Sequence, residues 1–125
     1  MRKLFTGVLI ANLLFEGWIG LILLFKISPD DSDPLGVHTA WATDYAFAAL
    51  VIASLAFWVW KNRYQRNIAR LTLGILSSFH LLLAISTGMA VADGDPLAAP
   101  IIHASLALLS ITLFATQKQW ADDLA

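Results

Sequence analysis

The stretch LFTGVLIANLLFEGWIGLILLFKI, residues 4–27, decides the fold. Only Glu16 and Lys26 are charged in it. A helix needs about 20 mostly apolar residues to cross a bilayer, so this stretch predicts a transmembrane helix. It is longer than the apolar core of a secretory signal peptide, which has roughly 7–15 residues, and it lacks a small-residue cleavage pattern. We therefore expect it to be retained as the first span.

Three further apolar stretches follow at about 39–60, 68–92 and 98–116. The breaks between the four stretches are rich in charge, proline and glycine, as turns are. Hydrophobic residues make up 58% of the chain and charged residues 14%, whereas soluble domains carry about 25% charged residues. Short connections favour sequential neighbours in space. The sequence thus predicts an all-α integral membrane protein, with residues 1–125 forming one up-down-up-down four-helix bundle.

Composition also excludes several classes of protein. The net charge is −1 and basic residues form no patch outside the loops, so nucleic acid is not an expected partner. The chain has no cysteine, which excludes disulfides, thiolate metal sites and cysteine nucleophiles. It contains no glycine-rich phosphate loop, no HExxH and no Gly-x-Ser-x-Gly motif.

The basic residues predict the orientation in the membrane. Of the eight lysines and arginines, all except Lys26 fall on one side of the predicted spans. Positive charge collects on the cytoplasmic side, so we expect both termini and the loop at 61–66 to be cytoplasmic. Tryptophans near the predicted membrane surfaces are expected to anchor the helices there: Trp41, Trp58, Trp60 and Trp120.

Each predicted span carries one ionisable residue: Glu16, Asp44, His80 and His103. Such residues are costly in a membrane and mark functional sites. Each lies on a helical stripe of mostly small or polar residues, and small residues let membrane helices approach one another. We therefore expect all four to point inward. The stripes are Asn12, Glu16 and Gly20; Asp44, Ala48 and Val51; Ser77, His80, Ala84, Thr87 and Gly88; and His103, Ala107 and Ser110.

Counting residues along the spans predicts two tiers. Glu16 and His80 lie roughly 17 Å from the outer helix ends, and Asp44 and His103 lie roughly 8 Å from them, at 1.5 Å per residue. In an up-down bundle the first and third helices are diagonal, as are the second and fourth. We therefore expect Glu16 to pair with His80 and Asp44 to pair with His103.

These residues favour a site that binds a lipophilic small molecule and transfers protons to it, as an isomerase or cyclase would. Glu16 and His80 are the candidate catalytic proton donor and acceptor. Asn12, Asp44, Ser77 and His103 are the candidate ligand-binding residues. Besides the lipid bilayer, the expected partner is this lipophilic molecule, and a homo-oligomer is compatible because four short helices bury little surface.

Two alternatives stay open. The same groups could form a relay in a small proton-coupled transporter or in an accessory subunit of a membrane oxidoreductase. Two histidines and two carboxylates could also bind a divalent metal or haem. The two tiers place His80 and His103 about 9 Å apart in depth, which disfavours haem, and no metal ligand or cofactor is assigned.

The sequence resembles the small bacterial four-span proteins related to DoxX. The resemblance is carried by Gly20-Leu21-Ile22-Leu23-Leu24-Phe25 before a proline-containing loop, by Asp44 early in the second span, and by His80 and His103 in the third and fourth spans. It covers most of the chain and transfers no catalytic residue. It implies a bacterial inner-membrane protein, a type that includes accessories to oxidoreductases.

Overall fold

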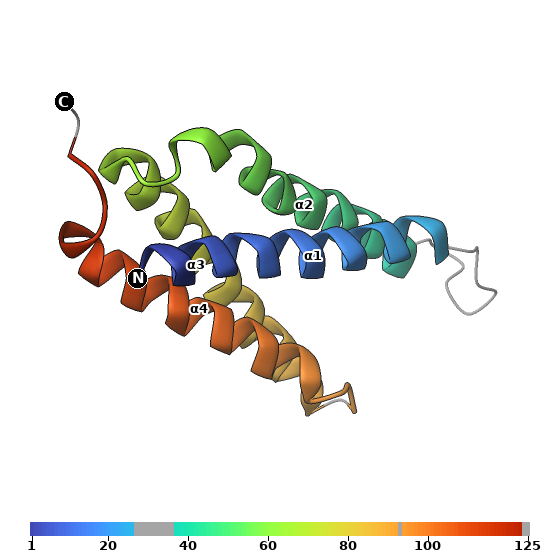
Figure 1. Ribbon diagram of the computed structural model, residues 1–125. Coiled ribbons are helices and arrows are strands. Elements are labelled where there is room, and N and C mark those ends of the chain that lie inside the picture. The colour runs from blue at the N-terminus through green and yellow to red at the C-terminus, as the bar shows by residue number, and fades with distance from the viewer. Residues whose placement is uncertain (27–36, 93, 124–125) are drawn as a thin grey trace. The chain divides into compact units, whose positions relative to one another are not determined.

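A computed structural model describes residues 1–26, 37–92 and 94–123. Across these residues the chain is all-α, so this part of the fold prediction is confirmed. Residues 28–36, in the break between the first two predicted spans, lie outside the described residues, as do the expected end of the first span at Ile27 and Asp93. The elements in chain order are α1 (Arg2–Lys26), α2 (Val37–Val59), the short 3-10 helix η1 (Trp60–Asn62), α3 (Arg66–Val91), α4 (Ala98–Thr116) and the short 3-10 helix η2 (Gln117–Gln119) (Figure 1).

All four α-helices are long and apolar enough to cross a membrane, over Arg2–Phe25, Ala40–Asn62, Arg66–Val91 and Ala98–Gln119. Their contacts divide into two compact units, which are described separately below. The first consists of Leu9–Trp58, and the second of Met1–Val8 with Val59–Ala125. The arrangement of 1–125 as one up-down bundle stays a prediction.

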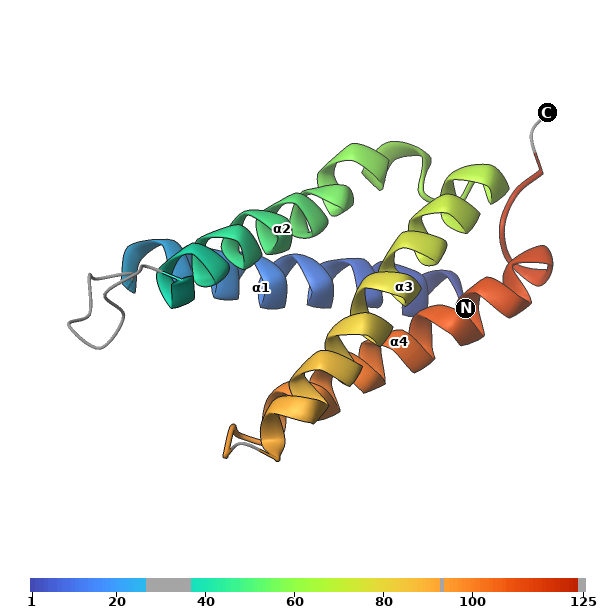
Figure 2. The ribbon, with the colours of Figure 1, turned by 180° about the vertical axis from the view of Figure 1, so that it is seen from behind.

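In the unit Leu9–Trp58, α1 and α2 lie side by side (Figure 2). The two helices pack closely at Gly20. A Cβ atom added to Gly20 would lie 2.9 Å from the backbone oxygen of Ala46, closer than carbon and oxygen normally approach. One α2 face is a stripe of four buried alanines: Ala46, Ala49, Ala53 and Ala56. A glycine facing small residues is the usual way in which membrane helices approach closely.

The inward stripe expected on the second span was therefore wrong. Asp44, Ala48 and Val51 are all exposed. The predicted stripe follows the helical period from the one charged residue of this span, Asp44. The alanine stripe two residues further along the helix has the same period and packs without the cost of burying a charge.

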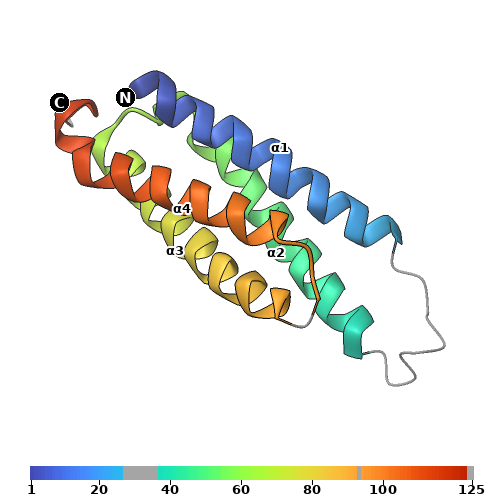
Figure 3. The same ribbon diagram turned by 90° about the horizontal axis from the view of Figure 1, so that it is seen from below.

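In the other unit, α3 and α4 run antiparallel and lie side by side (Figure 3). The turn between them is capped at Gly94, whose φ of 105° is the left-handed conformation that glycine adopts without strain. Gly94 N–H donates to the Val91 carbonyl at 3.1 Å, and Asp95 N–H donates to the Ala90 carbonyl at 3.2 Å. These two bonds form a Schellman cap, which ends α3 and turns the chain into α4.

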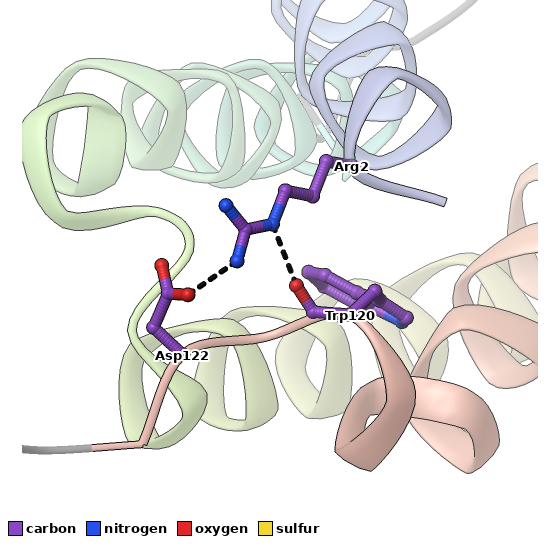
Figure 4. A network of polar contacts seen from close by, with 3 residues as sticks. All are labelled: Arg2, Trp120 and Asp122. Carbon is purple, nitrogen blue, oxygen red and sulfur yellow. Dashed lines mark hydrogen bonds and ion pairs between the residues drawn. The ribbon is translucent and has the colours of Figure 1, made fainter.

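The C-terminal segment of the same unit folds back onto the start of α1 and the turn before α3. Arg2 Nε donates to the Trp120 carbonyl at 2.7 Å, and the Arg2 guanidinium also forms an ion pair with Asp122 (Figure 4). Asp122 N–H donates to the Tyr64 carbonyl at 2.7 Å, within a parallel bridge. We call these contacts the terminal clasp. They place the N-terminus, the turn at 60–65 and the C-terminal segment at one end of this unit.

One of the four tryptophans, Trp120, does not have the membrane-anchoring role that the sequence predicts. Trp41, Trp58 and Trp60 are exposed, which agrees with membrane anchoring. Trp120 was expected to do the same, but it is buried against Phe5, with ring centroids 5.2 Å apart. Its indole N–H donates to the Leu113 carbonyl at 3.3 Å, so Trp120 is part of the packed interior.

Candidate functional site

The two span histidines meet in the interior of the α3–α4 unit. His80 Nδ1 and His103 Nδ1 lie 3.1 Å apart, and the ring centroids are separated by 5.4 Å. His80 is 0% exposed and His103 is 2% exposed. His80 lies on the α3 face that also buries Leu73 and Leu76, and His103 lies on the α4 face that buries Leu106 and Ser110. Helical periodicity therefore places each imidazole on the buried face of its helix.

A separation of 3.1 Å between two ring nitrogens is a hydrogen-bond distance. A neutral imidazole carries one N–H and one lone pair, so such a bond requires complementary tautomers. The donor ring holds its proton on Nδ1 and leaves Nε2 as a base. The acceptor ring then carries its proton on Nε2, as an acid. The pair thus offers one proton acceptor and one proton donor at its two outer nitrogens.

Two serine hydroxyls extend this region along the helices. Ser77 lies one turn before His80 on α3, and Ser110 lies two turns after His103 on α4. The Oγ atoms of both serines are buried and make no hydrogen bond. Because the two helices are antiparallel, both serines are displaced from the histidine pair toward the same end of the unit. They are free to bind a polar group of a guest molecule.

Four other hydroxyls on these helices are satisfied locally, unlike those of Ser77 and Ser110. Thr87, Ser105, Thr112 and Thr116 each donate to the carbonyl four residues earlier, at 2.6–2.8 Å. This bond is the ordinary way for a hydroxyl to be satisfied inside a helix. Ser77 was a predicted ligand-binding residue. Ser110 was on a predicted stripe but was not assigned a role, and its burial without a partner adds it to the candidate site.

The two-tier pairing expected from the sequence did not include the contact between His103 and His80. His103 was expected to pair with Asp44, which lies in the other unit and is exposed, so that pairing stays a prediction. The helix ends were predicted within two residues, so faulty boundaries are not the cause. Counting along parallel axes neglects the length of two imidazole side chains and the tilt at which membrane helices cross.

The remaining predicted site residues lie on α1, in the unit Leu9–Trp58. Asn12 and Glu16 are both 0% exposed. Asn12 Nδ2 donates to the Ile52 carbonyl at 3.0 Å, which ties α1 to α2. Asn12 thus has a packing role in this unit, and its assignment to ligand binding stays a prediction. Glu16 lies one turn further along the same buried face.

The histidine pair also has the spacing of two metal ligands. Metal–nitrogen bonds of about 2.0–2.1 Å and two nitrogens 3.1 Å apart give a nitrogen–metal–nitrogen angle of about 100°. That angle fits adjacent ligands of a tetrahedral ion. Haem fits less well, because its two axial nitrogens lie on opposite sides of the iron, roughly 4 Å apart.

The sequence matches no protein-family model, no curated protein and no solved structure.

Proposed function

We propose that this chain is an integral membrane protein in which the His80–His103 pair transfers protons to and from a small lipophilic molecule. The observation that carries the proposal is the 3.1 Å contact between two buried imidazoles on helices that are apolar enough to span a membrane. Buried ionisable groups in spans are costly and are retained for function. A molecule that reaches such a site from the bilayer is itself lipophilic.

The hydrogen-bonded pair allows a balanced proton transfer. The unprotonated Nε2 of the donor ring accepts a proton from carbon or oxygen of the bound molecule. The Nδ1 proton of that ring then crosses to Nδ1 of its partner, and the partner releases its Nε2 proton to a second position of the molecule. One proton enters and one leaves, and the two tautomers are exchanged. This sequence is the chemistry of an isomerisation.

We also assign Glu16 to this chemistry, because the sequence predicts that it pairs with His80. It is the fifteenth residue of α1, and His80 is the fifteenth residue of α3. In an up-down topology these helices cross the membrane in the same direction, so equal positions correspond to similar depths. A buried carboxylic acid at that depth would supply or collect the proton at the end of the imidazole pair. Ser77 and Ser110 would hold a polar group of the molecule.

The bacterial inner membrane, implied by the resemblance to DoxX-like proteins, is the proposed location. The excess of basic residues on one side supports cytoplasmic termini. The terminal clasp supports the weaker statement that the N-terminus and the C-terminal segment are on the same side, because Arg2 contacts Trp120 and Asp122 directly.

Deuterium labelling tests the proposal without knowledge of the substrate. Purified protein is incubated with a total bacterial lipid extract in D₂O, and apolar molecules are searched by mass spectrometry for deuterium bound to carbon. We expect labelling by the wild type and a decrease of about 10²-fold or more in His80→Gln and Glu16→Gln. Ser105→Ala is the matched control, because Ser105 is exposed on the same helix as His103 and bonds within that helix.

The melting temperature of each variant in detergent separates loss of chemistry from loss of folding. Equal labelling by folded wild type and folded His80→Gln would end the proton-transfer proposal. Labelling that falls only in proportion to the folded fraction would assign the histidines to packing.

A metal site is the second candidate, because the Nδ1 spacing fits two ligands of one tetrahedral ion. In that case both rings would hold their protons on Nε2 and direct both Nδ1 lone pairs at the ion. Equilibrium dialysis against Zn²⁺ and the absorption spectrum with Co²⁺ test this. Binding that is lost in both His80→Gln and His103→Gln would support the metal site, and wild-type protein without bound metal would contradict it.

A further inference from the structure

A second feature of the α3–α4 unit has no part in the proposed chemistry. A groove of about 1070 Å³ is lined by the first three turns of α3 and by the end of α4 with η2. Its polar end is formed by Arg66, Arg70, Gln117 and Lys118, and its apolar floor by Leu71, Ile75 and Phe114. We call it the basic groove. Leu71 is 65% exposed, so the floor is open to the surroundings of the helix.

The charges of the basic groove are unbalanced. Arg66, Arg70 and Lys118 contribute three positive charges, whereas Asp123 contributes the one negative charge in the lining. Asp123 forms an ion pair with Arg66, which leaves Arg70 and Lys118 to attract an anion. The groove therefore favours a ligand with a negative head.

A buried donor in the groove points to the same conclusion. The Nε–H of Arg66 is buried and makes no hydrogen bond. Leaving a buried N–H unpaired is costly. A bound phosphate would accept a hydrogen bond from it.

The start of α3 also favours a bound anion. The first turn of this 26-residue helix contains no acidic residue, and Arg66 and Arg70 lie in its first five residues. A helix N-terminus carries a partial positive charge, so cations there are unfavourable and anions are stabilised. An anion bound between these arginines would relieve the repulsion.

We propose that the basic groove binds one anionic phospholipid, with its headgroup phosphate between Arg66, Arg70 and Lys118. One acyl chain would lie along Leu71, Ile75 and Phe114. The polar end and the apolar floor form one continuous site on helices that are apolar enough to span a membrane, which matches a molecule with a charged head and a hydrocarbon tail. Basic pockets at the ends of membrane helices bind anionic lipid headgroups in this way. The proposal is independent of the histidine chemistry.

Lipid titration of the full chain in a neutral detergent tests the proposal. Phosphatidylglycerol and phosphatidylcholine with identical acyl chains are added, and bound lipid is counted by native mass spectrometry. We expect one phosphatidylglycerol to bind and phosphatidylcholine to bind much more weakly. Each basic residue near a lipid phosphate contributes about fivefold in Kd, so Arg70→Gln with Lys118→Gln should weaken binding by roughly 25-fold. Both residues are exposed, so folding should be retained, as the melting temperature without lipid will show.

The matched control is Lys61→Gln, which removes an exposed positive charge from η1 outside the groove. It should leave the Kd unchanged. A second pair of variants probes the floor. A Cβ added at Gly74 would lie 3.9 Å from the Phe114 ring, an ordinary contact, so Gly74→Ala should bind lipid normally. The larger side chain of Gly74→Leu would fill the floor and should reduce binding.

Three results would overturn the lipid proposal. Equal binding of the two lipids would show that the phosphate environment is not selective. Equal weakening by Lys61→Gln would reduce the effect to general charge attraction. Displacement of the lipid by inorganic phosphate at a similar concentration would assign the groove to a free anion.

Discussion

Gly20 provides the sharpest test of how α1 packs on α2. In Gly20→Ala, the new Cβ would lie 2.7 Å from Leu50 Cγ and 2.9 Å from the Ala46 carbonyl oxygen. Carbon atoms in good contact are about 3.5–4.0 Å apart, so the two helices must separate by roughly 1 Å. Backbone shifts of this kind cost about 1–3 kcal/mol. The better helix propensity of alanine returns about 1 kcal/mol. We expect a net loss of up to about 2 kcal/mol.

The same helix offers two matched controls. A Cβ at Gly7 would meet nothing within 4 Å, and a Cβ at Gly17 would lie 3.8 Å from Ala53 Cβ, an ordinary contact. Both variants gain helix propensity without a clash, so Gly7→Ala and Gly17→Ala should be neutral or more stable by up to about 1 kcal/mol. Because the gain in helix propensity is common to the three variants, Gly20→Ala should be less stable than these two controls by about 1–3 kcal/mol.

The assay is reversible unfolding by SDS in mixed micelles, followed by circular dichroism, with the three variants measured side by side. The expected order of the free energy of unfolding places Gly20→Ala below the wild type and the other two variants at or above it. If Gly20→Ala is as stable as Gly7→Ala, the close approach of α1 and α2 at this position is refuted.

Three further predictions follow from the same contacts. Asn12→Leu should lower the free energy of unfolding in SDS by about 1 kcal/mol, because it removes the bond to the Ile52 carbonyl; unchanged stability would contradict a tie between α1 and α2. Trp120→Ala should cost about 3 kcal/mol in the same titration, whereas Trp58→Ala, at an 80% exposed position, should cost far less; equal effects would contradict the burial of the Trp120 indole. A reporter that works only in the cytoplasm should be active when fused after Ala125, and activity of a reporter that works only in the periplasm would reverse the predicted orientation.

The helices could be predicted from sequence because each is a long apolar run with clear punctuation. The turn at Gly94 is an example, since a glycine next to aspartate and proline is a strong local signal. Such signals depend on neighbouring residues alone. They fixed the ends of all four helices within two residues, apart from the end of the first span at Ile27, which lies outside the described part of the chain.

The site could be predicted only in part, because it depends on which helix faces meet. Burial of His80 and His103 followed from the stripes, but their direct contact depended on side-chain reach and helix tilt. Asp44 was predicted on the buried face of α2 because it is ionisable, whereas the alanines at 46, 49, 53 and 56 form the packed face. The stripe of small residues therefore predicts the buried face of α2 better than the position of the charged residue does.

The terminal clasp and the basic groove were missed for a different reason. Arg2 and Asp122 are far apart in the sequence, and no local sequence pattern predicts that they form an ion pair. Arg70 and Lys118 were interpreted only as markers of orientation. Their placement around one groove depends on the antiparallel packing of α3 and α4.

The central claim is that two imidazoles share a hydrogen bond within the α3–α4 unit, and nitrogen NMR of ¹⁵N-histidine-labelled protein in detergent micelles tests it most directly. The bond requires one ring protonated on Nδ1 and the other on Nε2. We predict a scalar coupling between the two Nδ1 nuclei and one ring of each tautomer, with both signatures lost in His103→Gln. Two uncoupled rings, both protonated on Nε2, would contradict the proton-transfer account.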